Sequence, residues 1–237
     1  MAKRKTKKQR TPARLLINFT LRWVARLGLA LLAAMLLAIL LYRFVNPPIT
    51  PYMIGEWRRI GEIEKAWTPL DEIAPAMARS AVAAEDANFC QHWGFDMAAI
   101  RAALEDGGSR GASTITQQVV KNTYLWHGRS WVRKALEGVM TPLVELVWPK
   151  ARILEVYLNV AEFDDGVFGV GTAAQHYFGT SAARLSDRQA ARLAVLLPNP
   201  KARDPNQLSS AHRDRAARIA DGAATIRADG RAACFED

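Results

Sequence analysis

An apolar run near the N-terminus, Leu27–Tyr42 (LGLALLAAMLLAILLY), constrains this chain more than any other feature. Extended from Trp23 to Val45, it covers about 23 residues, which is enough for a helix to cross a bilayer. Arg26 and Arg43 lie near its ends, where long side chains can reach the lipid headgroups. The sequence therefore predicts one transmembrane helix at 23–45.

Basic residues precede this run. Residues 1–43 contain ten Lys and Arg and no acidic residue, a distribution that places the N-terminus in the cytoplasm and the rest of the chain across the membrane. The tail could also contact anionic lipid. A cleaved signal peptide is the alternative. The long apolar run and the Asn46-Pro47-Pro48 that follows, in place of a small-residue cleavage site, favour an uncleaved anchor.

The basic tail also accounts for the net charge. The whole chain has 32 basic and 23 acidic residues, so the 194 residues after position 43 carry 22 basic groups against all 23 acids. A domain so close to neutrality lacks the field that nucleic-acid binding requires. We therefore expect no nucleic-acid partner.

The outer part reads as helices joined by short loops. A helix start is indicated at Thr68-Pro69, a capping box at Ser186–Gln189 opens a helix to Leu197, and Ser209–Ala228 offers a last helix. No run alternates in the manner of a strand. The sequence predicts a mainly α protein in four parts: a basic tail (1–22), the transmembrane helix (23–45), a Pro-rich linker and membrane-proximal segment (46–66), and one domain (67–237).

Cys90 and Cys234 are the two cysteines of the chain. Outside the membrane one disulfide is permitted, but spacing alone cannot pair distant cysteines, and two thiols are an equal alternative. If the two pair, the C-terminal tail is tied beside the Glu85 segment.

The segment Ala84–Asp96 (AEDANFCQHWGFD) offers the clearest chemistry. On a continuous helix, Glu85, Phe89 and His92 would share one face. An acid at the end of an apolar helix is partly desolvated, which raises its pKa and suits it to proton transfer near neutral pH. A solvated acidic pair at a helix end is the simpler interpretation of this segment alone.

Three further segments carry polar groups. Gly107–Asn122 runs from a glycine-rich loop into a helix with hydroxyls, amides and Lys121. In 129–137 a row of cations suits a phosphate or pyrophosphate. A ladder of salt bridges along the helix would give the same sequence pattern. The apolar residues of this segment can face the core: Trp131, Val132, Ala135 and Leu136. In Lys150–Asn159 a buried stripe of Ile153, Leu154, Tyr157 and Leu158 leaves Glu155 to project elsewhere.

These segments follow one another in an order that resembles a known family. The chain strongly resembles the peptidoglycan glycosyltransferases of family 51 in four motifs that occur in this order. They are Glu85-Asp86-x-x-Phe89-x-x-His92-x-Gly94, then 111–118 (GASTITQQ) with Lys121-Asn122, then Arg133-Lys134-x-x-Glu137, then 153–159 (ILEVYLN). The resemblance covers about 69–200. It implies a lysozyme-like, mostly helical domain with a partly apolar membrane-proximal subdomain.

The resemblance also implies roles for residues. The reaction would be polymerisation of lipid II with release of undecaprenyl pyrophosphate. Glu85 matches the catalytic base, and Glu155 is taken as the second family glutamate, which assists the donor or holds a divalent ion. The other residues expected to contact substrate are Asp86, Phe89, Ser113, Gln117 and Gln118, with Lys121, Arg129, Arg133 and Lys134 for the pyrophosphate.

The remaining expectations concern cofactors, partners and location. A divalent cation, Mg²⁺ or Mn²⁺, would be bound with Glu155, and no organic cofactor is expected. The partners would be lipid II, the growing glycan strand, the membrane, and other cell-wall or division proteins. The resemblance places the domain on the periplasmic side of the bacterial inner membrane. Because no SxxK serine occurs, no transpeptidase activity is expected.

Two alternatives remain at this stage. A lytic enzyme with the same fold would cut finished glycan, and its row of cations would have no pyrophosphate to bind. A catalytically inactive anchor protein would only recruit cell-wall machinery. The four motifs in series weigh against both.

Overall fold

The computed structural model describes residues 12–107, 111–126, 128 and 130–236. The chain divides into two compact units, Met1–Phe44 and Val45–Asp237. The described part of the first unit is a single helix, α1 (Pro12–Tyr42). Its segment Asn18–Tyr42 has a mean hydropathy of 2.5 and is long and apolar enough to cross a membrane. The predicted transmembrane segment 23–45 overlaps α1 from Trp23 to Tyr42, where the helix ends, three residues before Val45.

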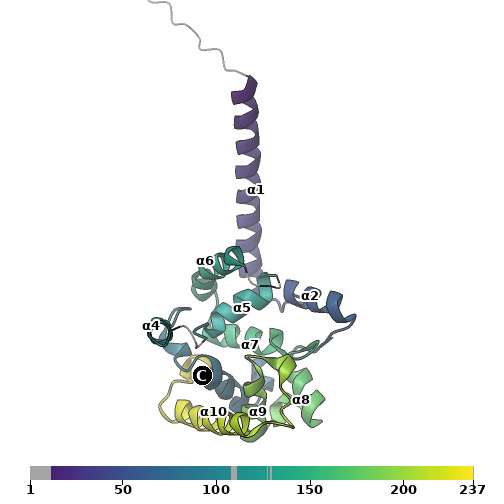
Figure 1. Cartoon of the computed structure of the whole chain (residues 1–237), viewed down its shortest axis with the longest axis vertical. Coiled ribbons are helices and arrows are strands. Elements are labelled where there is room, and N and C mark those ends of the chain that lie inside the picture. The colour runs from purple at the N-terminus through teal and green to yellow at the C-terminus, as the bar shows by residue number, and fades with distance from the viewer. Residues whose placement is uncertain (1–11, 108–110, 127, 129, 237) are drawn as a thin grey trace, which may run out of the picture. The chain divides into compact units, whose positions relative to one another are not determined.

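The second unit is mainly helical, which confirms the predicted fold class (Figure 1). Its helical elements, in chain order, are α2 (Pro51–Ile60), η1 (Leu70–Glu72), α3 (Pro75–Glu85), η2 (Phe89–Gln91), α4 (Met97–Glu105), α5 (Ile115–Tyr124), α6 (Trp131–Val147), α7 (Lys150–Val160), α8 (Val170–Phe178), η3 (Ala182–Arg184), α9 (Asp187–Leu196), η4 (Pro200–Ala202), α10 (Ser210–Ala228) and α11 (Ala233–Glu236).

A small sheet accompanies the helices. Its strands are β1 (Glu64–Lys65), β2 (Glu162–Asp164) and β3 (Val167–Phe168). β3 lies in the middle, parallel to β1 and antiparallel to β2. Strands of two or three residues are too short to produce a period-2 pattern, so the sequence did not indicate them.

The core of the unit is built from two helix groups. α7 packs against α5, which in turn packs against α6, while α3, α9 and α10 pack on one another. The predicted stripe of α7 is confirmed, because Ile153, Leu154, Tyr157 and Leu158 are fully buried. Ala-rich faces let α3, α9 and α10 approach closely, around residues such as Ala191, Ala194 and Ile219.

Helix starts follow the capping signals in the sequence. Ser186 and Gln189 form the predicted capping box of α9, and Ser209 caps α10. At Thr68-Pro69 the chain makes only the 3₁₀ turn η1, and the helix begins six residues later, at Pro75.

Two further local predictions were wrong. α3 ends at Glu85, and Phe89 lies in the separate turn η2, so Glu85, Phe89 and His92 do not share one helix face. On α6, Trp131 and Val132 are 91% and 66% exposed rather than facing the core. The helical period fixes which residues share a face but not which face meets the core.

Candidate active site

Glu85 is the last residue of α3. Its carboxylate accepts a hydrogen bond of 2.8 Å from the side-chain amide of Gln118 on α5. Burial raises the pKa of Glu85, while the Gln118 hydrogen bond and the charges of Arg215, Lys121 and Arg203 lower it. The carboxyl group is therefore held in a partly desolvated position, as proton transfer near neutral pH requires.

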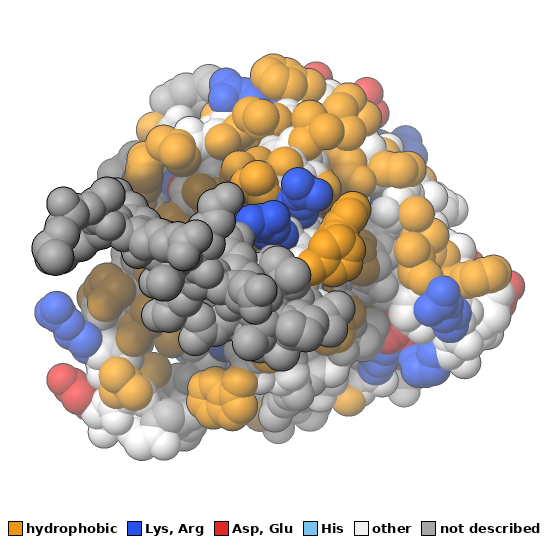
Figure 2. Space-filling view, turned by 90° about the horizontal axis from the view of Figure 1, so that it is seen from above, with side chains coloured by type: hydrophobic (Ala, Val, Ile, Leu, Met, Phe, Trp, Pro, Cys, Tyr) orange, Lys and Arg blue, Asp and Glu red, His pale blue; other side chains and the backbone are white. Residues whose placement is uncertain are grey.

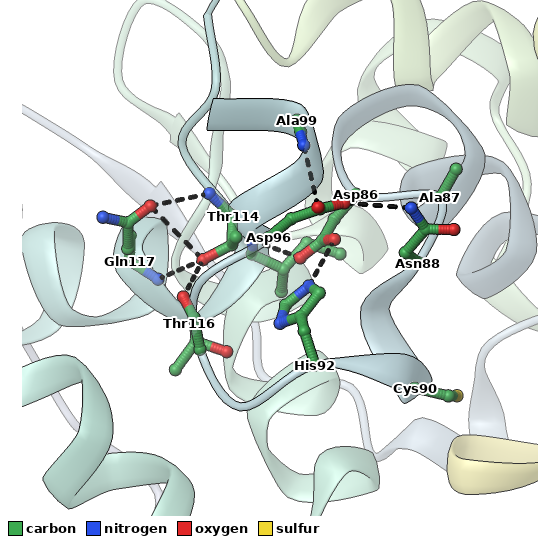
Figure 3. A network of polar contacts seen from close by, with 12 residues as sticks. Asp86, Ala87, Asn88, Cys90, His92, Asp96, Ala99, Thr114, Thr116 and Gln117 are labelled. Atoms are coloured by element: carbon green, nitrogen blue, oxygen red, sulfur yellow. Dashed lines mark hydrogen bonds and ion pairs between the residues drawn. The ribbon is translucent and has the colours of Figure 1, made fainter. Parts of the chain in front are cut away.

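Asp86, the next residue, links His92 in the following loop to the start of α5 (Figure 3). One of its oxygens lies 2.7 Å from Nε2 of His92, and the other accepts a hydrogen bond of 3.0 Å from the backbone N–H of Ile115. Ile115 is the first residue of α5, where a helix favours negative charge. Because Asp86 is buried with both oxygens engaged, it positions the segment and offers little to a substrate.

The loop 86–96 is held by further polar contacts. Asn88 donates to Asp96, which caps α4, and the Thr114 hydroxyl donates to the carbonyl of Gly94 (Figure 3). Gly94 has φ +79°, and a Cβ there would lie 2.5 Å from Cγ2 of Thr141. A side chain at position 94 is thus excluded both by backbone conformation and by space.

The start of α5 divides the predicted polar residues into two kinds. Thr114 and Gln117 form a capping box, in which the Gln117 oxygen accepts from the Thr114 N–H. Gln117 is buried and serves the helix end, whereas Ser113 is exposed beside it. Gln118 and Lys121 are three residues apart on α5, so they share one helix face. Glu85 lies near this face.

Lys121 interacts through its charge with both Glu85 and a second acid, Glu137. Burial lowers the pKa of Lys121; the charges of Glu137 and Glu85 raise it, and those of Arg133 and Lys134 lower it. Glu137 is itself buried and pairs with Arg133 at 3.4 Å and with Lys134. We call Glu85, Gln118, Lys121 and Glu137 the Glu85 group. Arg129, the remaining predicted cation, lies outside the described residues.

Phe89 lies behind the site. It is fully buried, packs its ring against Phe235 with centroids 6.4 Å apart, and has the ammonium group of Lys150 4.3 Å from its ring centroid. Lys150 also donates to the carbonyl of His92 and pairs with Glu145 at 2.8 Å. These contacts give Phe89 a packing role for the loop rather than a surface for substrate.

Glu155 is placed differently from the other predicted residues. It pairs with Arg152 at 2.6 Å and lines a cleft of about 1060 Å³ together with residues of α3, the start of α7 and α11. Among the described residues, Glu155 belongs to no group of three or more acids, histidines or cysteines close enough to hold a metal ion. A carboxylate already paired with a guanidinium and outside any such group does not fit a divalent-ion site.

Sequence reasoning missed three groups around Glu85. Glu137 was noted only as part of the motif and of a ladder with Arg133, yet its burial and its effect on Lys121 place it in the site. Arg203 and Arg215 follow the motifs along the chain, and their charges reach Glu85 through the fold. The i,i+4 spacing of Arg133 and Glu137 was the one available signal, and it could not reveal burial.

An apolar stripe on α6 borders the Lys121 region. Val132, Val139 and Leu146 recur every seven residues and are about 60% exposed or more, and Trp131 opens the helix beside them. Figure 2 shows hydrophobic side chains interspersed with Lys and Arg side chains over one face. Exposed large apolar side chains next to cations are typical of surfaces that meet lipid headgroups and acyl chains.

The cysteines form a disulfide, Cys90–Cys234, which settles the alternative that the sequence left open. The bond joins η2, four residues after Asp86, to α11 at the C-terminus.

Comparison with known proteins places this geometry in context. Residues 53–224 match the model of the family described as transglycosylase. A biosynthetic peptidoglycan transglycosylase of Jannaschia sp. (strain CCS1) is 60% identical over 99% of both chains. Proteins with the same name from Stutzerimonas stutzeri (strain A1501) and Caulobacter vibrioides are 53% and 45% identical, over 79% and 88% of this chain and 81% and 93% of their own.

Proposed function

This chain belongs to the transglycosylase family and is a peptidoglycan glycosyltransferase, and we propose that it polymerises lipid II with Glu85 as the general base. Glu85 takes the proton of the GlcNAc 4-hydroxyl of the acceptor. The oxygen attacks C1 of the terminal MurNAc of the growing chain. The bond between C1 and the pyrophosphate breaks, and undecaprenyl pyrophosphate leaves.

The observation that carries the proposal is the environment of the Glu85 carboxylate. Within the described part of the chain its one hydrogen-bond donor is Gln118, and burial raises its pKa. A general base is most effective when its pKa lies close to the working pH. A carboxylate paired directly with a guanidinium would be too weak a base.

Cations one turn further along α5 and on α6 stabilise the leaving group of the reaction. A pyrophosphate leaves as an anion, so no general acid is needed and positive charge stabilises the transition state. Lys121, Arg133 and Lys134 gather around Glu137, next to Glu85. A glycosidase would instead need a second carboxyl group poised as an acid, whereas Glu137 is already paired with two cations.

The apolar features suit a substrate that is itself a lipid. Asn18–Tyr42 provides an anchor, and the stripe on α6 provides a face that can enter the membrane interface. The basic residues before the anchor orient the N-terminus toward the cytoplasm and the domain toward the periplasm. Contacts with other cell-wall or division proteins remain part of the prediction.

Glu155 does not fit the predicted metal site, so no step is assigned to a metal there. Dependence on Mg²⁺ or Mn²⁺ stays a prediction, and titration of the polymerisation assay with a chelator tests it. The absence of transpeptidase activity is likewise proposed, and analysis of the product for cross-linked peptides tests it.

The decisive experiment compares two glutamate-to-glutamine variants. Purified wild type, Glu85→Gln and Glu155→Gln are incubated with lipid II in detergent, and glycan strands are separated by length. Loss of a general base typically costs about 10²–10⁴-fold, so Glu85→Gln should make almost no product. Glu155→Gln is the matched control and should retain most of the activity, because its carboxylate lies with Arg152 instead.

Each alternative predicts a different result. A lytic enzyme leaves lipid II unchanged and cuts finished peptidoglycan. An inactive recruiting protein gives no product with either substrate, and Glu85→Gln then changes nothing in the cell. Equal polymer from wild type and Glu85→Gln would contradict the role of Glu85 while keeping the reaction.

A further inference from the structure

The C-terminal residues 229–236, which we call the C-terminal brace, lie against the start of loop 86–96. The disulfide joins Cys234 to Cys90. The ring of Phe235 packs on Phe89. The guanidinium of Arg231 donates to the carbonyl of Ala87 at 3.1 Å.

The brace also reaches α3 itself. Glu236 at the end of α11 pairs with Arg79 at 2.7 Å at the surface of the domain. The brace thus contacts the helix that ends in Glu85 on one side and the loop that follows Glu85 on the other. Arg79 and Ala87 lie on either side of Glu85 in the sequence.

On its outer side the loop is also held by Lys150, whose ammonium group contacts the Phe89 ring and donates to the carbonyl of His92. Its inner side is fixed by Asp86 and Gly94 through contacts to the start of α5, while His92 contacts Asp86 within the loop. The turn η2 that carries Phe89 and Cys90 is only three residues long, and such a short 3₁₀ turn has little stability of its own. Phe89 is fully buried, with Phe235 forming part of its surroundings.

We propose that the Cys90–Cys234 disulfide and the C-terminal brace position Glu85 for proton transfer. The two cysteines act as positioning residues: they touch no substrate and hold the loop so that the carboxylate stays at its desolvated place beside Gln118. The inference about rate rests on the proposed function. The inference about the order of the loop does not.

The test uses the full chain in detergent with the disulfide intact, reduced and re-formed. Dithiothreitol breaks the S–S bond by supplying two electrons and two protons, which gives two thiols on the protein and cyclic oxidised dithiothreitol. Labelling of thiols followed by mass spectrometry reports the state of Cys90 and Cys234. Cys90→Ser, Cys234→Ser and the double variant repeat the loss of the bond without reductant, and circular dichroism confirms that each form is folded at the assay temperature.

Loss of the bond should lower kcat for lipid II polymerisation by roughly 10-fold, since a displacement on the order of 1 Å can cost up to ~10²-fold. KM should stay close to its value with the bond, because Lys121, Arg133 and Lys134 lie on other elements. The acid limb of the pH profile should move, because the surroundings of Glu85 change. Re-oxidation should restore the wild type, and the double variant should not respond to dithiothreitol.

Hydrogen exchange gives a readout that does not depend on activity. Amides of 87–92 and of the brace should exchange faster in the reduced form, while those of α7 serve as an internal control and keep their protection. Unchanged kcat and unchanged exchange in folded, reduced protein would overturn the proposal. If oxidised wild type makes no polymer at all, the proposed function fails, and exchange in 87–92 still decides whether the brace holds the loop.

Discussion

The Glu85 group and a second group, which we call the Glu56 cluster, both bring buried carboxylates next to lysine side chains. The cluster consists of Glu56 on α2, Glu162 on β2 and Asp165, together with Arg59 and Lys201. Lys201 lies 2.7 Å from Glu56, 3.5 Å from Glu162 and 3.4 Å from Asp165, and Arg59 pairs with both Glu56 and Asp165.

The two lysines respond in opposite ways. Burial alone would lower the pKa of Lys201, but its hydrogen bond to Glu56 and the nearby acids raise it. For Lys121 burial prevails, and the pKa is lowered. Within the Glu56 cluster each acid meets a cation directly, whereas Glu85 has an amide from Gln118.

This difference separates the Glu56 cluster, which has a structural role, from the Glu85 group, which is placed for chemistry. The carboxylates of the cluster pair with Lys201 and Arg59 and so tie α2 to the region of β2 and η4. The three acids of the cluster are close enough to hold a metal ion, but Lys201 and Arg59 already supply the positive charge. An acid and a lysine that remain incompletely neutralised are typical of catalytic sites.

The largest effects should come from the same substitution made in each group. Glu85→Gln should reduce polymerisation by about 10²–10⁴-fold. It should leave the protein at least as stable at neutral pH, because a carboxyl group whose pKa is raised by folding destabilises the native state once it is ionised. Lipid II turnover and thermal unfolding measure the two outcomes.

Glu56→Gln should show the reverse. It removes a buried charge that Arg59 and Lys201 neutralise, so the free energy of unfolding should fall by about 1–3 kcal/mol. The melting temperature should fall by roughly 2–4 °C for each kcal/mol, with kcat unchanged. A loss of kcat in folded Glu56→Gln, or a loss of stability in Glu85→Gln, would contradict the assignment of a structural role to the Glu56 cluster and a catalytic role to the Glu85 group.

The two lysines allow a second, smaller comparison. Lys121→Met should lower kcat/KM by about 10–100-fold, the value of one charge-assisted contact of roughly 1.5–3 kcal/mol. Lys201→Met should leave kcat/KM unchanged and lower the free energy of unfolding by about 1 kcal/mol, a modest value because the side chain is one-third exposed. Similar kinetics for the two variants would contradict the assignment of the pyrophosphate site.

The smallest effect should come from a single hydroxyl. Tyr52 donates a hydrogen bond of 2.9 Å to Glu162. Tyr52→Phe keeps the ring contact with Phe168 and should cost about 1 kcal/mol of unfolding free energy. Chemical denaturation at constant pH measures it, and activity at low temperature should equal that of the wild type.

The sequence predicted the Glu85 group better than the Glu56 cluster, and the reason is distance along the chain. Motifs at fixed spacing on α3, α5 and α6 could be read as one site. Glu162 follows Glu56 by 106 residues and Lys201 follows Glu162 by 39, and only the fold brings them together. The mainly α class and the stripe of α7 followed from periodicity in the same local way.

Burial was the quantity that the sequence could not supply. Phe89 and Gln117 were expected at the substrate but lie inside, and Trp131 was expected inside but lies outside. Glu137 was interpreted as part of a salt-bridge ladder with Arg133, because the sequence did not reveal its burial. Helical spacing is a property of one element, whereas exposure depends on what packs against it.

The pH dependence of kcat/KM for lipid II polymerisation tests the central claim most directly, with wild type compared with Gln118→Met and Glu56→Gln. The raised pKa of Glu85 predicts that activity falls on acidification at a pH above that of an ordinary glutamate. Because Gln118 stabilises the ionised form, Gln118→Met should move this acid limb to higher pH, while Glu56→Gln should leave it in place. An acid limb at the ordinary glutamate value that neither substitution moves would contradict Glu85 as the base.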